Sequence, residues 1–185
     1  MRTLYHFPLQ PQSRKVRLLL KEKHLDCDLV VERPWERREA FLHLNPACET
    51  PVLTEDAGLI LSGDYAITEY LEEAYEEPAL FGRSRGERAE VRRISAWFDG
   101  KFNREVTQLL LEEKIGKRLY GRGGPDSNAL RAGKANIHVH LHYVGWLIDR
   151  RNWLAGDEMS LADLAAAAHL SCLDYLGDVP WDEHP

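Results

Sequence analysis

The stretch LSGDYAITEYLEE, residues Leu61–Glu73, joins a predicted strand to a predicted helix. Its apolar residues recur at helical spacing from Asp64 onward. A helix N-terminus offers unpaired backbone N–H groups and the positive end of a dipole, which together favour an anion. Here that position holds Asp64, itself an anion. The stretch therefore raises the question of whether a ligand pocket lies at this helix and whether Asp64 closes it.

The residues before this stretch predict a small mixed sheet. The segment Arg2–Phe7 alternates as a strand does, a helical segment follows, and DCDLVVE then predicts a second strand. The βαβ order favours a parallel pair with a right-handed crossover. TPVLTEDAGLILS has the pattern of a hairpin, with an acidic and Gly-containing turn between two strands. Together with the helix at Asp64, this order predicts an α/β thioredoxin-like domain over residues 1–77.

The first predicted helix, SRKVRLLLKEKH, carries an apolar face. Val16, Leu19 and Leu20 fall on one side of it. Ser13 stands at its start and is a candidate N-cap, because a serine hydroxyl accepts a hydrogen bond from the first-turn backbone. A loop with a short irregular helix is expected between the second strand and Pro46.

The second half of the chain predicts only helices. Residues 78–86 gather Pro, Gly and Ser and are predicted to be a linker, so residues 87–185 form a separate all-α domain. Its first helix is expected from Glu87 to about Ile115, followed by a Gly-rich loop at 116–127.

Two further helices complete that domain. One carries Ile137, Leu141, Val144 and Ile148 on a single stripe. The other begins at Ser160, where the sequence SLAD has the pattern of a capping box.

Composition narrows the classes of function. The chain has 185 residues, is 44% hydrophobic and 29% charged, and carries a net charge of −6, which argues against a nucleic-acid partner. No apolar run approaches the length of a membrane span, and the N-terminus does not have the pattern of a signal peptide. Three scattered cysteines indicate free thiols in a reducing compartment. A cytoplasmic location is therefore expected.

Several local motifs resemble one superfamily. They are FPLQPQSRKVRLLL, LNPACETPVL, LILSGDYAITEYLEE and WLAGDEMSLADLAAAAHL, and they cover almost the whole chain. With a small α/β half followed by a helical half, the chain resembles the glutathione-transferase superfamily. The resemblance implies a cis peptide bond at Thr50–Pro51, which presents a backbone edge to a ligand. It also implies that Thr50, Pro51 and Asp64 form a glutathione site or its vestige.

The chain departs from that superfamily where the chemistry occurs. Related enzymes usually place a serine before the first-turn proline, to stabilise the glutathione thiolate, whereas this chain has Gln10. An amide is a poor substitute for a hydroxyl there. Ser13 could support a thiolate from the helix start, although an N-cap role is expected for it. The first turn holds no cysteine, so thioredoxin-type redox chemistry is not expected.

Asp64 departs from the superfamily as well. Relatives carry an acid or amide followed by serine, and this chain has Gly63 and Asp64. Asp64 is expected to cap its own helix and to repel an incoming carboxylate, by up to roughly 4 kcal/mol at close range. The alternative is that Asp64 receives the ammonium group of a glutamyl substrate.

Two other groups of residues are candidate sites. In RPWERRE, Trp35 either folds back onto its domain or forms a partner contact with Arg37 and Arg38 at the rim. In IHVHLH, His138 and His142 share a helix face as zinc ligands do, but solvated histidines are the expectation because no third ligand is evident. Cys48 is expected to be an inert structural thiol.

Within the superfamily, the helical half resembles one subfamily most. The segments at 96–133, 140–147 and 169–181, with RPWERR, are similar to glutathione-transferase-like regulators of bacterial cell division that bind FtsZ. The resemblance implies a non-enzymatic homodimer, without a cofactor, that binds FtsZ filaments, alters their curvature and helps to control constriction. Members of that subfamily continue beyond the equivalent of Pro185, so the resemblance implies an incomplete helical domain. The alternative is an active glutathione transferase that uses glutathione and Ser13 to conjugate or isomerise small electrophiles.

Overall fold

A computed structural model describes residues 1–184. The chain divides into two compact units, one ending at Leu80 and the other beginning at Phe81. The boundary falls inside the segment 78–86 for which a linker is predicted.

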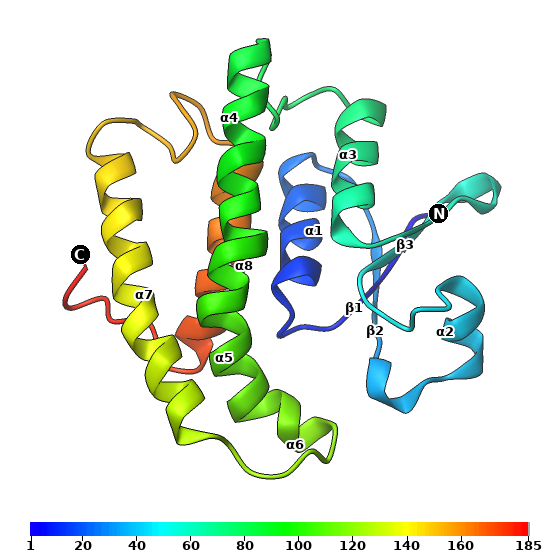
Figure 1. The fold of residues 1–185 in the computed structure, drawn as a ribbon. Helices are drawn as coiled ribbons and strands as arrows, with labels where there is room; N and C mark the ends of the chain where they lie inside the picture. Colours follow the sequence, from blue (N-terminus) through cyan, green and yellow to red (C-terminus); the bar gives the residue numbers. More distant parts are fainter. Residues whose placement is uncertain (185) are drawn as a thin grey trace. The chain divides into compact units, whose positions relative to one another are not determined.

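The first unit contains four strands and three α-helices (Figure 1). In chain order they are β1 (Thr3–His6), α1 (Pro11–Glu22), β2 (Asp28–Val31), the 3-10 turn η1 (Pro34–Glu36), α2 (Glu39–Leu44), β3 (Val52–Thr54), the 3-10 turn η2 (Asp56–Gly58), β4 (Ile60–Ser62) and α3 (Asp64–Ala74). The predicted order of elements is confirmed.

The sheet has the strand order β2-β1-β3-β4. β1 pairs with β2 in parallel, whereas β3 is antiparallel to both β1 and β4. The parallel βαβ half and the β3–β4 hairpin are the two parts that the sequence predicts. This mixed four-stranded sheet is the thioredoxin-like arrangement, and it leaves β2 and β4 as its edges.

Alternation along the strands gives each face of the sheet its own apolar layer. Leu4 and its partner Leu53 are fully buried on one face. On the other face, Tyr5 and Val52 pack against Phe41 of α2. The predicted apolar side of α1 is also confirmed, since its members are at most 3% exposed; they are Val16, Leu19 and Leu20.

The start of α1 differs from the prediction. Gln10 occupies the N-cap position and Pro11 is the first helical residue. Proline suits that position because its fixed φ is already helical and its missing N–H would have no partner there. The prediction of Ser13 as the N-cap is therefore wrong, because the helix begins two residues before it.

The second unit is entirely helical. One continuous helical segment consists of α4 (Arg85–Ala96), the π-helical η3 (Trp97–Thr107), α5 (Gln108–Leu111), the π-helical η4 (Glu112–Gly116) and α6 (Lys117–Leu119). The predicted helix is confirmed, but it continues past Ile115 as far as Leu119. It ends where Gly121 adopts a positive φ of 64°.

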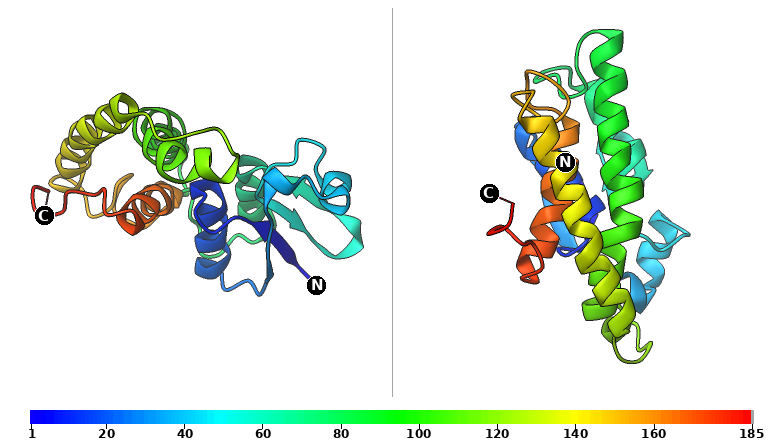
Figure 2. Two further views of the ribbon diagram at one scale, coloured as in Figure 1. Left: turned by 90° about the horizontal axis from the view of Figure 1, so that it is seen from below. Right: turned by 60° about the vertical axis from the view of Figure 1, so that its left-hand side comes forward.

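Two more helices, α7 (Ser127–Ile148) and α8 (Leu161–Tyr175), pack against the long helical segment (Figure 2). The capping box of α8 is confirmed: the backbone N–H of Ser160 donates to Asp163, and the Ser160 hydroxyl accepts from the first turn. Within residues 1–184, none of the helices is long and apolar enough to cross a membrane.

Candidate functional site

Gln10 is the centre of the polar contacts at the first turn. Its side-chain carbonyl oxygen accepts hydrogen bonds from Ser13 Oγ at 2.7 Å and from Thr50 Oγ1 at 2.5 Å. Ser13 Oγ also accepts from the backbone N–H of Phe7 at 3.3 Å. One glutamine thus orders two hydroxyl groups that lie 37 residues apart in the chain.

These hydrogen bonds occupy the hydroxyl protons that a bound thiolate would need. Ser13 is completely buried, and Thr50 is 5% exposed. A serine that stabilises a thiolate must donate its proton to the sulfur, whereas Ser13 donates to Gln10. The implied cis bond is present at Thr50–Pro51, and the hydrogen bond from Thr50 to Gln10 places Gln10 beside it.

Asp64 lies at the first helical position of α3, after the N-cap Gly63. Its carboxylate lies 2.5 Å from the ammonium nitrogen of Lys15, a side chain only 3% exposed. The prediction that Asp64 caps its own helix is therefore wrong. The carboxylate pairs with the buried Lys15 and does not accept from the helix backbone, because a buried ammonium requires a counter-charge.

The ion pair reduces the negative potential that Asp64 would otherwise create at the start of α3. Lys15 compensates the negative charge of Asp64, so the predicted repulsion of an incoming carboxylate is largely removed. In the described residues, the backbone N–H groups of Asp64, Tyr65 and Ala66 donate no hydrogen bond. The helix start is thus not blocked by Asp64, whereas Gln10 accepts the hydroxyl protons of Ser13 and Thr50.

A second buried pair joins the same two helices. Lys23 Nζ lies 2.8 Å from Glu72 and donates to the carbonyl oxygens of Tyr75 and Pro78. Lys15 on α1 and Lys23 at its C-cap lie about two turns apart, as do their partner acids Asp64 and Glu72 on α3. Together the pairs fix the position of α3 on α1, and with it the position of Asp64.

Trp35 occupies η1 and folds back onto its own unit. Its ring is half-buried and meets the ring of Phe7 edge-to-face, with centroids 5.1 Å apart. Part of the indole still faces solvent. Of the two predicted outcomes, the structure shows the packing contact, and a partner contact remains a prediction for the exposed part.

The two arginines after Trp35 differ in their surroundings. Arg38 donates from Nε to Glu32 at 3.1 Å, and the hydrogen bond and charge of that buried carboxylate raise the pKa of Arg38. Arg37 is exposed, adopts a positive φ of 46°, and forms no ion pair within residues 1–184. Of the two, Arg37 is therefore the side chain with its charge available.

The three histidines of α7 fall on two faces. His138 and His142 share one face, where His138 Nδ1 lies 3.0 Å from His184 Nε2. His140 is buried, contrary to the expectation of solvated histidines, because Trp97 and Glu105 supply partners for both ring nitrogens. Among residues 1–184, no three side chains form a group that could hold a metal ion.

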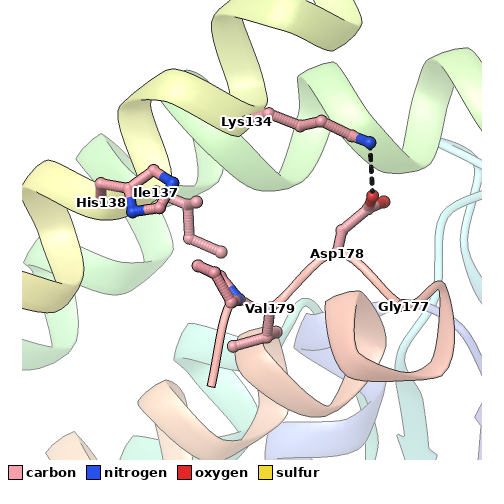
Figure 3. A pocket seen from close by; sticks show the side chains of 7 residues that line it. Lys134, Ile137, His138, Gly177, Asp178 and Val179 are labelled. Atoms are coloured by element: carbon pink, nitrogen blue, oxygen red, sulfur yellow. Dashed lines mark ion pairs between the residues drawn. The ribbon is translucent and has the colours of Figure 1, made fainter. Parts of the chain in front are cut away.

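A small pocket of about 180 Å³ lies in the helical unit (Figure 3). Its lining residues are Lys134, Ile137, His138, Gly177, Asp178, Val179 and Pro180. The carboxylate of Asp178 is 1% exposed and lies 2.5 Å from Lys114 Nζ and 3.6 Å from Lys134 Nζ. The two ammonium groups compensate the charge of the buried carboxylate. These ion pairs link η4, α7 and the turn after α8, which gives the residues around this pocket a structural role.

Sequence patterns missed Lys15 and Asp178. Both are charged residues that the fold buries with a partner distant in sequence. The only local signal is Lys15 itself, which lies next to Val16 on the apolar side of α1. A lysine on such a stripe indicates a buried acid elsewhere in the fold.

The first unit is thioredoxin-like, is followed in the chain by an all-helical unit, and carries its polar cluster beside a cis-proline. This is the fold of a glutathione-transferase-like protein. A family model for the glutathione S-transferase N-terminal domain matches residues 4–79. The chain is 51% identical to FtsZ-localized protein A of Caulobacter vibrioides, over 98% of this chain and 81% of that protein. The chain belongs to the glutathione S-transferase family.

Solved structures agree with this assignment. A glutathione S-transferase from Rhodospirillum rubrum F11 superimposes with a TM-score of 0.97 and 57% identity, over 100% of this chain and 83% of that chain. FzlA from C. crescentus superimposes with a TM-score of 0.95 and 50% identity, over 99% and 82% of the two chains. The glutathione-transferase fold predicted from the sequence is confirmed.

Proposed function

We propose that this protein binds FtsZ filaments and regulates their curvature and constriction in bacterial cell division, without catalysing a reaction of glutathione. The observation that carries the proposal is the 51% identity to FtsZ-localized protein A, which extends over 98% of the chain. Identity spread over both units favours a shared role more strongly than a shared fold does. Such a role places the protein in the cytoplasm.

The first turn supports the non-catalytic part of the proposal. The hydroxyls of Ser13 and Thr50 both donate to Gln10, and residues 7–13 contain no other hydroxyl or thiol. A thiolate in this pocket would lack the donor that lowers its pKa. In this proposal, binding to FtsZ filaments depends on the outer surface of the protein and not on the first turn.

For the contact with FtsZ we retain Trp35, Arg37 and Arg38. Tryptophan and arginine contribute strongly to protein interfaces, and the exposed Arg37 follows the half-buried Trp35 by two residues in the chain. Homodimerisation would strengthen binding to a polymer, because two linked sites raise the effective concentration for the second contact.

Co-sedimentation with FtsZ filaments tests this proposal. Trp35→Ala would also lose the Phe7 contact, so the informative pair is Trp35→Phe, which keeps an aromatic ring, and Arg37→Ala, which disturbs no ion pair. We expect wild-type protein to pellet with filaments and both variants to pellet less, with melting temperatures close to that of the wild type. Absence of wild-type protein from the pellet would refute the proposal.

The alternative is an active glutathione transferase. The 57% identity to the Rhodospirillum rubrum glutathione S-transferase and the uncapped start of α3 favour it. Calorimetric titration with glutathione separates the two functions. Saturable heat together with turnover of an aromatic electrophile would favour the enzyme, whereas we expect neither.

A further inference from the structure

β2 is an edge strand with an unusually apolar outer side. Among residues 1–184 it pairs with β1 alone, and all four of its residues are exposed. Three of the four are large and apolar: Leu29 is 49% exposed, Val30 36% and Val31 55%. Natural sheets commonly protect an edge with lysine, proline or a bulge, because an open edge recruits another strand. Residues 28–31 contain none of these.

The backbone of β2 is only half satisfied. The N–H groups of Asp28 and Glu32 donate inward to Arg2 and His6 of the neighbouring segment, each at 2.9 Å. In a parallel pair, alternate residues point their N–H groups toward the same neighbour. The N–H groups of Leu29 and Val31 therefore point outward, and within the described residues they have no hydrogen-bond acceptor.

These features specify the kind of partner. Outward N–H and C=O groups in a row are satisfied by an extended chain, and the side chains beside them supply apolar contacts on both faces of the sheet. Val30 lies opposite Tyr5 on the face covered by Phe41, whereas Leu29 lies opposite Leu4 on the other face. A helix or a rigid small ligand would leave the backbone groups unpaired.

A second copy of β2 fits this edge poorly. In an antiparallel pair, residues with outward N–H groups must face one another. The register that overlaps the apolar residues sets Leu29 opposite Val31 of the second copy, and therefore sets Asp28 opposite Glu32. Acidic side chains directly opposite each other destabilise a strand pair. A strand with a basic residue opposite Asp28 has no such penalty.

We propose that the edge of β2 binds an extended segment of the partner protein as an added strand, with apolar residues over Leu29–Val31 and a basic residue opposite Asp28. The proposal rests on the proposed function, and the segment therefore belongs to FtsZ. It extends the proposed partner surface from residues 33–38, which follow β2 after Glu32, along the sheet edge.

A pair of edge variants tests the proposal. Val31→Lys places a charge on the β2 edge, and Ile60→Lys does the same on β4, where Ile60 is 43% exposed. We expect Val31→Lys to weaken co-sedimentation with FtsZ by about tenfold and Ile60→Lys by less than about twofold. Light scattering of both variants reports the oligomeric state.

Each outcome decides between accounts. If wild-type protein does not pellet, the proposed function fails and the inference fails with it. If wild-type protein pellets and Val31→Lys pellets equally well, the function stands and the inference is overturned. If Val31→Lys changes the oligomeric state and spares FtsZ binding, the occupant of the edge is a second copy, which also overturns it.

Hydrogen exchange provides a readout that needs no substitution. We expect the amides of Leu29 and Val31 to exchange rapidly in the free protein and to be protected when FtsZ is added. Asp28 and Glu32, whose amides already donate inward, serve as internal references. Unchanged exchange at Leu29 and Val31 in the bound state would overturn the proposal even if Val31→Lys failed to fold.

Discussion

The first turn of α1 and the outer edge of β2 belong to the same small sheet unit but differ in how their polar groups are satisfied. At the first turn, the hydroxyls of Ser13 and Thr50 both donate to Gln10. At the edge, the N–H groups of Leu29 and Val31 face outward beside exposed apolar side chains. The hydroxyls beside Gln10 thus have an acceptor within the protein, whereas the outward N–H groups at the edge of the sheet have none in the described residues.

This difference indicates where a partner can gain free energy. A ligand at the first turn must displace hydrogen bonds that already exist, so its net gain is small. A strand added at β2 replaces water on groups that lack a protein partner and also buries apolar surface. The comparison therefore favours recognition of a protein segment over binding of a small thiol.

The largest effect should come from breaking the ion pair that holds α3 beside the pocket. Asp64→Leu removes the carboxylate that lies 2.5 Å from the buried ammonium of Lys15, and we expect a loss of about 3 kcal/mol in the free energy of unfolding. Urea denaturation measures it. The double variant Lys15→Met/Asp64→Leu should recover most of that loss, because the buried ammonium is removed together with the carboxylate that pairs with it. Equal losses in both variants would contradict a pairing role.

Removing the acceptor at the first turn should have an intermediate effect. Gln10→Ala leaves the hydroxyls of Ser13 and Thr50 buried without an acceptor, and we expect a loss of about 1–3 kcal/mol in the free energy of unfolding. Gln12→Ala in the same turn is the matched control and should change stability by less than about 0.5 kcal/mol. Equal melting curves for the two variants would show that Gln10 does not order the turn.

The smallest effect concerns the pH dependence of stability, to which His6 on β1, the strand paired with β2, contributes. Burial, with a contribution from Arg17, lowers the pKa of His6, and burial likewise lowers the pKa of His140 in the helical unit. As pH falls through the range in which histidine ordinarily titrates, the unfolded chain therefore binds more protons than the folded chain does. We expect stability to decline on acidification from about pH 7.5 to about pH 5.5, by at most about 1.4 kcal/mol per pH unit for each proton.

His6→Leu tests the contribution of the sheet unit to that slope. His6 is 4% exposed and its Nδ1 has no hydrogen-bond partner in the described residues, so an apolar side chain should be tolerated. Chemical denaturation across the same pH range should give a shallower dependence for the variant. An unchanged slope would show that His6 does not contribute to it.

Periodicity predicted the elements of this fold well. Val16, Leu19 and Leu20 recur at helical spacing and are buried, and the strand–turn–strand pattern before α3 forms the expected hairpin. These patterns succeed because each element must bury one apolar side whatever its neighbours are. The resemblance to a known family supplied the cis bond at Thr50–Pro51, which periodicity does not encode.

The caps and the polar partners could not be predicted in the same way. Ser13 and Asp64 both have side chains that suit a helix start, but each is engaged by a partner that only the tertiary structure provides. The histidines of IHVHLH, including His140, were expected to be solvated because local spacing suggested no third metal ligand. Trp97 and Glu105, from another part of the chain, give it a buried and bonded position.

The most direct test of the account is co-sedimentation of the wild-type protein with FtsZ filaments, with and without a millimolar excess of reduced glutathione. If the outer surface carries the function and the first turn is internally satisfied, the pelleted fraction should be the same in both conditions. Loss of the protein from the pellet when glutathione is added, or its absence from the pellet in both conditions, would contradict the account.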